Sequence, residues 1–235
     1  MKASKLSLVA LLALGMMVPA AIAMNGDDHA NKSDKQAQKE DKGEKKDKKE
    51  KKDEKKGEGV AVGSIAPGFT LTDTDGKSVN LADYAGKVVV LQWFNPGCPF
   101  VVKHYKGANT FNDLYTKYTE KGVVFLAINS GAAGKEGAGK ETNATAKKDW
   151  KIEYPVLLDE AGTVGKTYGA QRTPEMYIID KDGKVVYHGA IDDESGMKGV
   201  GKTNYVAKAL DEVLAGKPVT TAQTKPYGCT VKYGK

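Results

Sequence analysis

A continuous apolar run at residues 87–94, KVVVLQWF, constrains the fold of this chain more than any other feature. Strands buried on both faces of a helix-covered parallel sheet have this composition, whereas strands with one face in water alternate apolar and polar residues. A second run of this kind, VVFLAIN, occupies residues 123–129. Between the two runs, apolar residues recur near helical spacing from about 99 to 119. The chain is therefore expected to contain a parallel strand–helix–strand unit.

The segments around this unit predict an α/β fold with a central mixed sheet flanked by helices. Turn residues at 73–76 separate two extended segments, 68–72 and 77–81, which predicts an N-terminal β-hairpin. The remaining predicted elements are a helix ending near 150, a strand at 154–158, a helix at 161–168, a hairpin at 175–189 and a helix at 202–214. This order favours a mostly parallel sheet with an antiparallel pair at its end.

The first 59 residues are predicted to lie outside this fold. Residues 1–23 combine a basic start, an apolar run at 6–18 and small residues before the cut, which is typical of a signal peptide. The apolar run is shorter than the roughly 20 residues needed to span a bilayer. The prediction is a periplasmic protein, with membrane contact only if the signal stays uncleaved. Residues 24–59 are almost entirely charged or polar and are expected to form a disordered tether.

The net charge of +6 does not indicate a nucleic-acid partner. The tether holds 12 Lys against 11 Asp and Glu, so its own net charge is only +1. With the two lysines of the signal also removed, about +3 remains on residues 60–235. Such a weak field provides little long-range attraction for a polyanion.

The chain has two cysteines, Cys98 and Cys229, and neither belongs to a CxxC pair, a zinc-ligand cluster or a haem-attachment motif. No metal and no cofactor are therefore expected. Cys98 follows Asn95-Pro96-Gly97, the turn residues that end a buried strand before the next helix. That edge of an open α/β sheet is where such folds place their chemistry, and the first turn of a helix favours the reactive thiolate. We predict that Cys98 is an accessible nucleophile. The alternative is that Cys98 is a buried residue of the core.

Three segments resemble the peroxiredoxin-like, or redoxin, branch of the thioredoxin superfamily: WFNPGCPF at 93–100, QRTPEMYIID at 171–180 and KPYGC at 225–229. The resemblance extends over nearly all of 60–235 and implies a thioredoxin-like fold. Within that range we expect a redoxin domain at 60–218 and a C-terminal tail with Cys229 at 219–235.

The resemblance implies several residues that shape the site. The Thr173–Pro174 peptide bond is expected to be cis and to pack against the reactive cysteine. Trp93, Pro96 and Gly97 belong to the same motif as Cys98 and are expected to shape its surroundings.

The resemblance also implies candidate catalytic groups. Thioredoxins attack with the first cysteine of CxxC, and here Asn95 occupies that position. Peroxiredoxins carry TxxC, in which the hydroxyl orients thiolate and peroxide, and Asn95 offers a polar group in its place. Arg172, the only arginine of the chain, is a candidate to stabilise the Cys98 thiolate. A surface arginine is the alternative.

The predicted function is the reduction of hydroperoxides. The Cys98 thiolate would become a sulfenic acid, and Cys229, in a tail free to fold back, would resolve it to a disulfide that an exported thiol donor reduces. One alternative is a thiol:disulfide exchange protein that uses both cysteines on protein substrates. Another is a non-catalytic binding module with a structural disulfide.

Two further signals are interpreted as structural. Residues 134–140, GKEGAGK, imitate a phosphate-binding loop, but Glu141 replaces the Ser or Thr that such a loop requires, so a flexible loop is expected. His104 lies six residues beyond Cys98, off its helix face, and is expected on the helix surface.

Overall fold

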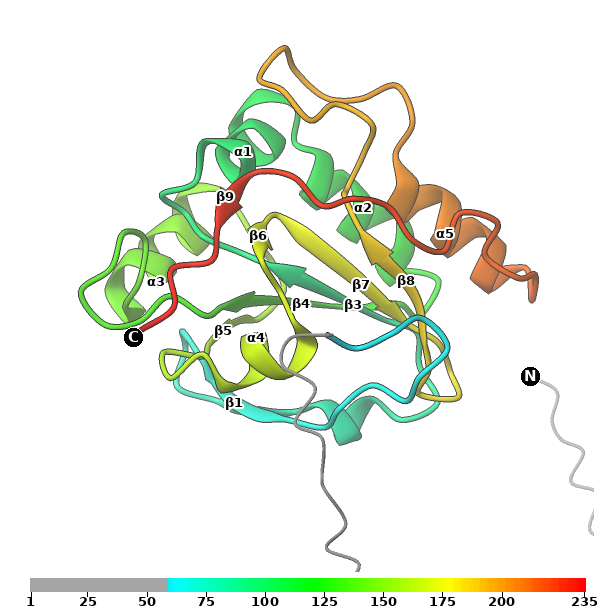
Figure 1. The fold of residues 1–235 in the computed structure, drawn as a ribbon, viewed down its shortest axis with the longest axis horizontal. Helices are drawn as coiled ribbons and strands as arrows, with labels where there is room; N and C mark the ends of the chain where they lie inside the picture. The colour runs from blue at the N-terminus through cyan, green and yellow to red at the C-terminus, as the bar shows by residue number, and fades with distance from the viewer. Residues whose placement is uncertain (1–58) are drawn as a thin grey trace, which may run out of the picture. The chain divides into compact units, whose positions relative to one another are not determined.

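The structure is a computed structural model that describes residues 59–235. The predictions for the signal peptide, 1–23, and for the tether up to residue 58 lie outside the described residues. The described part forms a seven-stranded sheet with the strand order β2-β1-β5-β4-β3-β7-β8 and with helices on both faces (Figure 1). None of its helices is long and apolar enough to cross a membrane.

The strands of this sheet are short and mostly coincide with the predicted segments. They are β1 (Thr70–Asp73), β2 (Ser78–Asn80), β3 (Val89–Trp93), β4 (Val124–Asn129), β5 (Val156–Leu158), β7 (Glu175–Ile179) and β8 (Val185–Gly189). The predicted hairpins are confirmed, since β1 pairs with β2 and β7 with β8, both antiparallel.

The sheet is mixed, as the α/β prediction stated, but it is not mostly parallel. Only two strand pairs, β3–β4 and β4–β5, are parallel. Strand β1 pairs antiparallel with β5, and β7 pairs antiparallel with β3. Strand composition reports burial on both faces and not direction, so the apolar runs could not reveal the reversed neighbours.

The helix predicted between the two buried strands is interrupted. It consists of α1 (Pro99–Val102), a π-helical turn η2 (Lys103–Gly107) and α2 (Thr110–Thr119), with Asn109 at a left-handed φ of 53° between the last two. The other elements are η1 (Leu81–Tyr84), α3 (Lys140–Asp149), α4 (Thr163–Tyr168) and α5 (Tyr205–Leu214). The last helix starts at Tyr205 because the Asn204 side chain caps it, accepting from the Ala207 N–H.

Strand β3 separates two apolar cores. Val90 and Phe94 lie in the core that also holds Cys98, together with residues of α1, α2 and α5. Leu91 and Trp93 lie in the opposite core with residues of α4. The period of two along a strand directs successive side chains to these opposite faces, and both faces are covered, which explains the unbroken apolar run.

The C-terminal segment crosses the molecule and is part of the fold. In Figure 1 it is the red chain that runs from the α5 side past β8 and β7 and ends near α3. Its strand β9 (Cys229–Thr230) pairs antiparallel with β6 (Arg172–Thr173), the two-residue strand that precedes Pro174.

The segment before β9 approaches the sheet at Gly189. A Cβ at this glycine would lie 2.2 Å from Thr224 Oγ1, and the glycine has a φ of 148°. Thr224 also accepts a hydrogen bond from the Ala190 N–H at 2.9 Å. The His188 N–H donates to the Ala222 carbonyl at 3.0 Å, and the Thr224 N–H donates to the His188 carbonyl at 3.1 Å. The segment predicted to be free enough to fold back is therefore folded back and held by these contacts.

Candidate active site

Cys98 lies at the junction between β3 and α1, where the sequence pattern placed it. It is the N-cap of α1, with an extended backbone, and its carbonyl accepts hydrogen bonds from the N–H groups of Val101 and Val102. The thiol donates to the carbonyl oxygen of Thr173 at 3.0 Å. Only 2% of the residue is exposed. The expectation of a reachable thiol is thus wrong for this conformation, because the core and the C-terminal segment cover the sulfur.

Cys229 is brought to the same place by the pairing of β9 with β6. The register sets Cys229 opposite Thr173, the residue whose carbonyl accepts from the Cys98 thiol. Both cysteines are free, and Cys229 is half-buried against the core that contains Cys98. Burial raises the pKa of the Cys229 thiol to about 12, with further contributions from a hydrogen bond with Cys98 and from the charge of that neighbour. The structure therefore unites two thiols that are far apart in the sequence.

Gly228 permits this approach. A Cβ at this position would lie 2.2 Å from the Thr173 carbonyl oxygen and 3.2 Å from Phe100 Cβ. Its φ of 104° is also one that side chains disfavour. The glycine of the KPYGC motif thus has a physical role in bringing Cys229 next to Cys98.

The Thr173–Pro174 peptide bond is cis, as the resemblance implied. The loop that contains it is organised by Glu175, which is 1% exposed and directly follows the proline. One carboxylate oxygen accepts the backbone N–H groups of Gln171 and Arg172 at 2.7 and 2.8 Å. The other oxygen contacts His188 Nε2 at 2.7 Å. Glu175 was not among the predicted site residues, although an acidic residue opening an otherwise apolar strand was a usable signal.

Asn95 builds the turn before Cys98. Its Oδ1 accepts the Gly97 N–H at 2.7 Å, and its Nδ2 donates to the Glu136 carbonyl at 3.0 Å. Asn129 Nδ2 donates to the Gly137 carbonyl at 2.8 Å. The glycine-rich loop predicted to be flexible is thus tied to the site, since its backbone accepts from both asparagines. A direct role of Asn95 toward a substrate remains a prediction.

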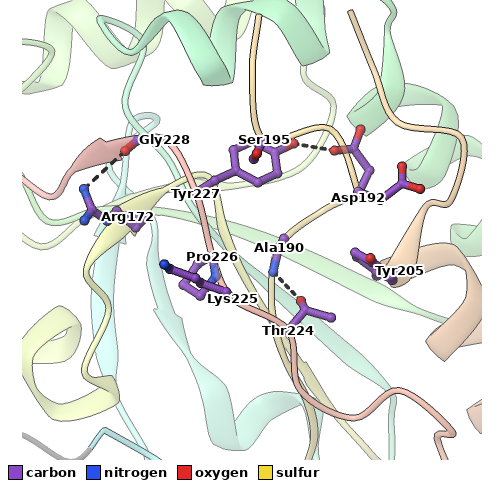
Figure 2. A pocket seen from close by; sticks show the side chains of 11 residues that line it. Arg172, Ala190, Asp192, Ser195, Tyr205, Thr224, Lys225, Pro226, Tyr227 and Gly228 are labelled. Atoms are coloured by element: carbon purple, nitrogen blue, oxygen red, sulfur yellow. Dashed lines mark hydrogen bonds between the residues drawn. The ribbon is translucent and has the colours of Figure 1, made fainter.

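Arg172 points along the C-terminal segment. Its Nη1 donates to the Gly228 carbonyl at 3.4 Å, as Figure 2 shows. It lines a cavity of about 480 Å³ whose other lining residues include Tyr205 and Lys225. Among the described residues, no hydrogen bond joins its guanidinium to Cys98, so its role in thiolate stabilisation also remains a prediction.

The other motif residues lie at different depths. Trp93 is fully buried on the sheet face opposite Cys98, and its Nε1 donates to Ser130 Oγ at 3.1 Å. Pro96 and Gly97 are half-buried in the turn, and a Cβ at Gly97 would lie 2.8 Å from Glu136 Cγ. Trp93 therefore packs at the end of β3 on the sheet face opposite Cys98. Gly97 allows the loop that contains Glu136 to pack on the turn.

The prediction that His104 lies on the helix surface is wrong. His104 is 0% exposed, and its Nε2 contacts the Tyr227 hydroxyl at 2.9 Å. Tyr227 donates in turn to Asp192 Oδ1 at 2.6 Å, the contact drawn in Figure 2. Burial lowers the pKa of His104 to about 4, against the attraction of the Asp192 charge. The prediction assumed α-helical rotation, whereas the π-helical turn changes the direction in which residue 104 points.

Lys103 completes this network around Tyr227. Its Nζ donates to the carbonyls of Glu194 and Gly196, both at 2.8 Å, and lies 4.8 Å from the centre of the Tyr227 ring. Tyr227 stands two positions before Cys229 in the sequence. The network therefore fixes the C-terminal segment just before it reaches the thiol pair.

Fold and site together define a thiol-based oxidoreductase with a thioredoxin-like fold. Residues 61–206 match the Redoxin family, and the chain belongs to that family. The family match begins one residue after the start expected for the domain and ends before the C-terminal segment that contains Cys229.

Relatives found by sequence similarity are named either as thiol-disulfide oxidoreductases or as peroxiredoxins. The chain is 36% identical over 134 residues to the thiol-disulfide oxidoreductase ResA of Bacillus thuringiensis subsp. konkukian, covering 56% of this chain and 70% of the relative. It is 34% identical over 139 residues to the chloroplastic peroxiredoxin Q of Triticum aestivum, covering 54% of this chain and 58% of the relative.

Two solved structures resemble the chain over most of the described part. An uncharacterized conserved protein from Geobacillus kaustophilus has a TM-score of 0.67 and 36% identity, covering 74% of this chain and 93% of that one. A hypothetical protein from Sinorhizobium meliloti has a TM-score of 0.68 and 30% identity, covering 76% and 97%.

Proposed function

We propose that the chain carries out thiol:disulfide exchange with protein substrates through a Cys98–Cys229 couple. The observation that supports this most is the β6–β9 pairing, which sets Cys229 opposite Thr173 while the Cys98 thiol donates to the Thr173 carbonyl. Two thiols that the fold holds together form a disulfide at little additional cost in chain entropy. The similarity to ResA, a thiol-disulfide oxidoreductase by name, agrees with protein thiols and disulfides as substrates.

The exchange runs in either direction. A substrate disulfide takes two electrons and two protons from the couple, which leaves Cys98 and Cys229 joined by one S–S bond. An exported dithiol donor returns two electrons and two protons and restores both thiols. The potentials of the substrate and the donor determine the net direction.

Hydroperoxide reduction is the second candidate. The Cys98 sulfur would take one peroxide oxygen to become a sulfenic acid and release an alcohol or water. Condensation with the Cys229 thiol would then form the disulfide and release a second water. The similarity to peroxiredoxin Q favours this route, as does a second thiol already in place. The residues expected to assist, Asn95 and Arg172, are engaged with backbone groups of the loop and of the C-terminal segment.

Mass spectrometry and two activity assays distinguish these functions. The reduced protein is treated with glutathione disulfide or with a small excess of hydrogen peroxide, and the loss of two hydrogens is timed. Exchange predicts that the Cys98–Cys229 disulfide forms with glutathione disulfide and that the protein catalyses insulin reduction by a dithiol. Peroxidase activity instead predicts peroxide consumption much faster than that of the unfolded chain. If neither reagent links the two cysteines, the exchange proposal is wrong.

We also infer that the protein acts in the periplasm, with 24–59 as a tether, 60–218 as the redoxin domain and 219–235 as the tail. The signal-like composition of residues 1–23 supports export. The mass of the protein from a periplasmic extract tests this placement. The expected mature chain begins at Met24, and a full-length chain retained in the membrane fraction contradicts it.

A further inference from the structure

We infer that a partner thiolate attacks the oxidised couple at Cys229 and not at Cys98. The mixed disulfide with the partner therefore forms on the C-terminal segment, and Cys98 is the sulfur that leaves. This inference rests on the proposed exchange function and specifies which atom meets the partner, a protein dithiol.

Access differs between the two sulfurs. Cys98 is 2% exposed and lies in the core beneath α1, among side chains such as Val101 and Phe94. Cys229 is only half-buried and lies in a two-residue strand with a single neighbour, β6. Exchange requires an incoming thiolate to reach one sulfur of the disulfide, so accessibility decides which sulfur is attacked.

A cavity also lies beside the residues that precede Cys229. It has a volume of about 480 Å³ and is lined by Gly228, the residue directly before Cys229, and by Arg172 and Tyr227 (Figure 2). The cavity therefore leaves room for a partner segment along the chain that leads to Cys229.

The expelled sulfur, once protonated, has a hydrogen-bond acceptor next to it. In the reduced protein the Cys98 thiol donates to the Thr173 carbonyl at 3.0 Å. After the S–S bond breaks, Cys98 takes a proton from solvent and regains this hydrogen bond. The second thiolate of the partner then attacks the partner sulfur bound to Cys229, the Cys229 sulfur leaves and is protonated, and the partner becomes the disulfide. Two electrons and two protons have passed from the partner to the couple.

Peptide mapping of a trapped intermediate tests the inference. The wild-type protein is oxidised until its mass shows the internal disulfide, mixed briefly with reduced glutathione, and quenched with acid. Cys98 and Cys229 lie on separate tryptic peptides, since lysines such as Lys103 and Lys208 separate them. The expected result is glutathione on the Cys229 peptide and a free thiol at Cys98. Glutathione on Cys98, or an even split, overturns the inference and leaves the exchange function standing.

Single-cysteine variants give an independent rate comparison. Cys98→Ser and Cys229→Ser are each loaded with an aromatic thiol as a mixed disulfide, and its release by glutathione is timed. Release from Cys229 is expected to be at least about tenfold faster than from Cys98. Equal or reversed rates contradict the inference. If the wild-type protein forms no internal disulfide at all, the proposed function fails together with this inference, so the two failures are distinguishable.

Discussion

The two cysteines belong to regions that are built in different ways. Cys98 stands between β3 and α1, in one of the two apolar cores, and its position follows from the strand, the turn and the helix that are adjacent in sequence. Cys229 stands in a segment with only two residues in a strand, and its position follows from contacts with distant residues, such as that between Tyr227 and His104. One thiol is placed by local structure and the other by a network.

This difference separates two kinds of sensitivity. Changes in the β3–α1 junction should act mainly through the stability of the whole fold. Changes in the C-terminal segment should act first on the encounter of the two sulfurs, while the sheet remains intact. Three substitutions in the C-terminal segment and one titration of His104 test the second of these expectations.

The largest effect is expected from Cys229→Ala. Without the second sulfur the internal disulfide cannot form, so insulin reduction should fall by at least about 100-fold. The thermal midpoint should change little, because Cys229 is only half-buried. Thr230→Ser, in the same strand, is the matched control and should retain activity. Full activity in Cys229→Ala would show that Cys98 works alone.

Gly228→Ala should disrupt the pairing of β9 with β6. The new Cβ would lie 2.2 Å from the Thr173 carbonyl oxygen, at a backbone φ of 104°. We expect a loss of about 3 kcal/mol in the free energy of unfolding, or displacement of the C-terminal segment with much slower disulfide formation. Gly183→Ala also has a positive φ but meets nothing within 4 Å, so it should cost only about 1 kcal/mol. Similar losses of unfolding free energy in both variants would show that the close approach of Gly228 to the Thr173 carbonyl is not the cause.

Acid should weaken the network through His104. Its pKa in the folded protein is about 4, below the ordinary value of 6.5, so the unfolded chain binds the proton more readily. The free energy of unfolding should therefore fall as the pH drops from about 6.5 toward about 4, by about 3 kcal/mol at most. Urea unfolding between pH 7 and pH 4 measures the slope, and His104→Gln should flatten it. An unchanged slope in that variant would assign the effect to other groups.

Tyr227→Phe should have the smallest effect. The change removes the hydroxyl between His104 and Asp192 and leaves two buried polar groups without this partner. A decrease of about 1 to 3 kcal/mol in the free energy of unfolding is expected, with slower formation of the internal disulfide. Tyr205→Phe, at the start of α5 and lining the same cavity, is the control. Disulfide formation at the wild-type rate in Tyr227→Phe would mean that the network does not position Cys229.

The sequence was most informative where structure depends on neighbours in the chain. The apolar runs predicted β3 and β4, and the turn residues after residue 94 predicted the place of Cys98. Both are local patterns of apolarity or backbone restriction. The cis peptide bond before Pro174 was implied by the family resemblance and not by a local pattern.

What the sequence could not reveal depends on contacts between distant segments. The C-terminal segment has no period, because its position comes from hydrogen bonds to other elements, for example between the Thr224 N–H and the His188 carbonyl. The burial of His104 depends on a π-helical turn that propensities do not encode. The sequence could not reveal the solvent accessibility of Cys98 either, since the segment that covers this residue lies more than a hundred residues further along the chain.

The position of β9 has a consequence for how the protein is assembled. Cys98 is synthesised long before Cys229, and the segments that form the strands from β4 to β8 are all made in the interval. A chain with just two cysteines has a single way to bridge itself, so folding cannot stall in a wrongly paired monomer. The hazard during biogenesis is instead exchange of the Cys98 thiolate with a foreign disulfide, which forms a mixed disulfide and releases the other foreign sulfur as a thiolate.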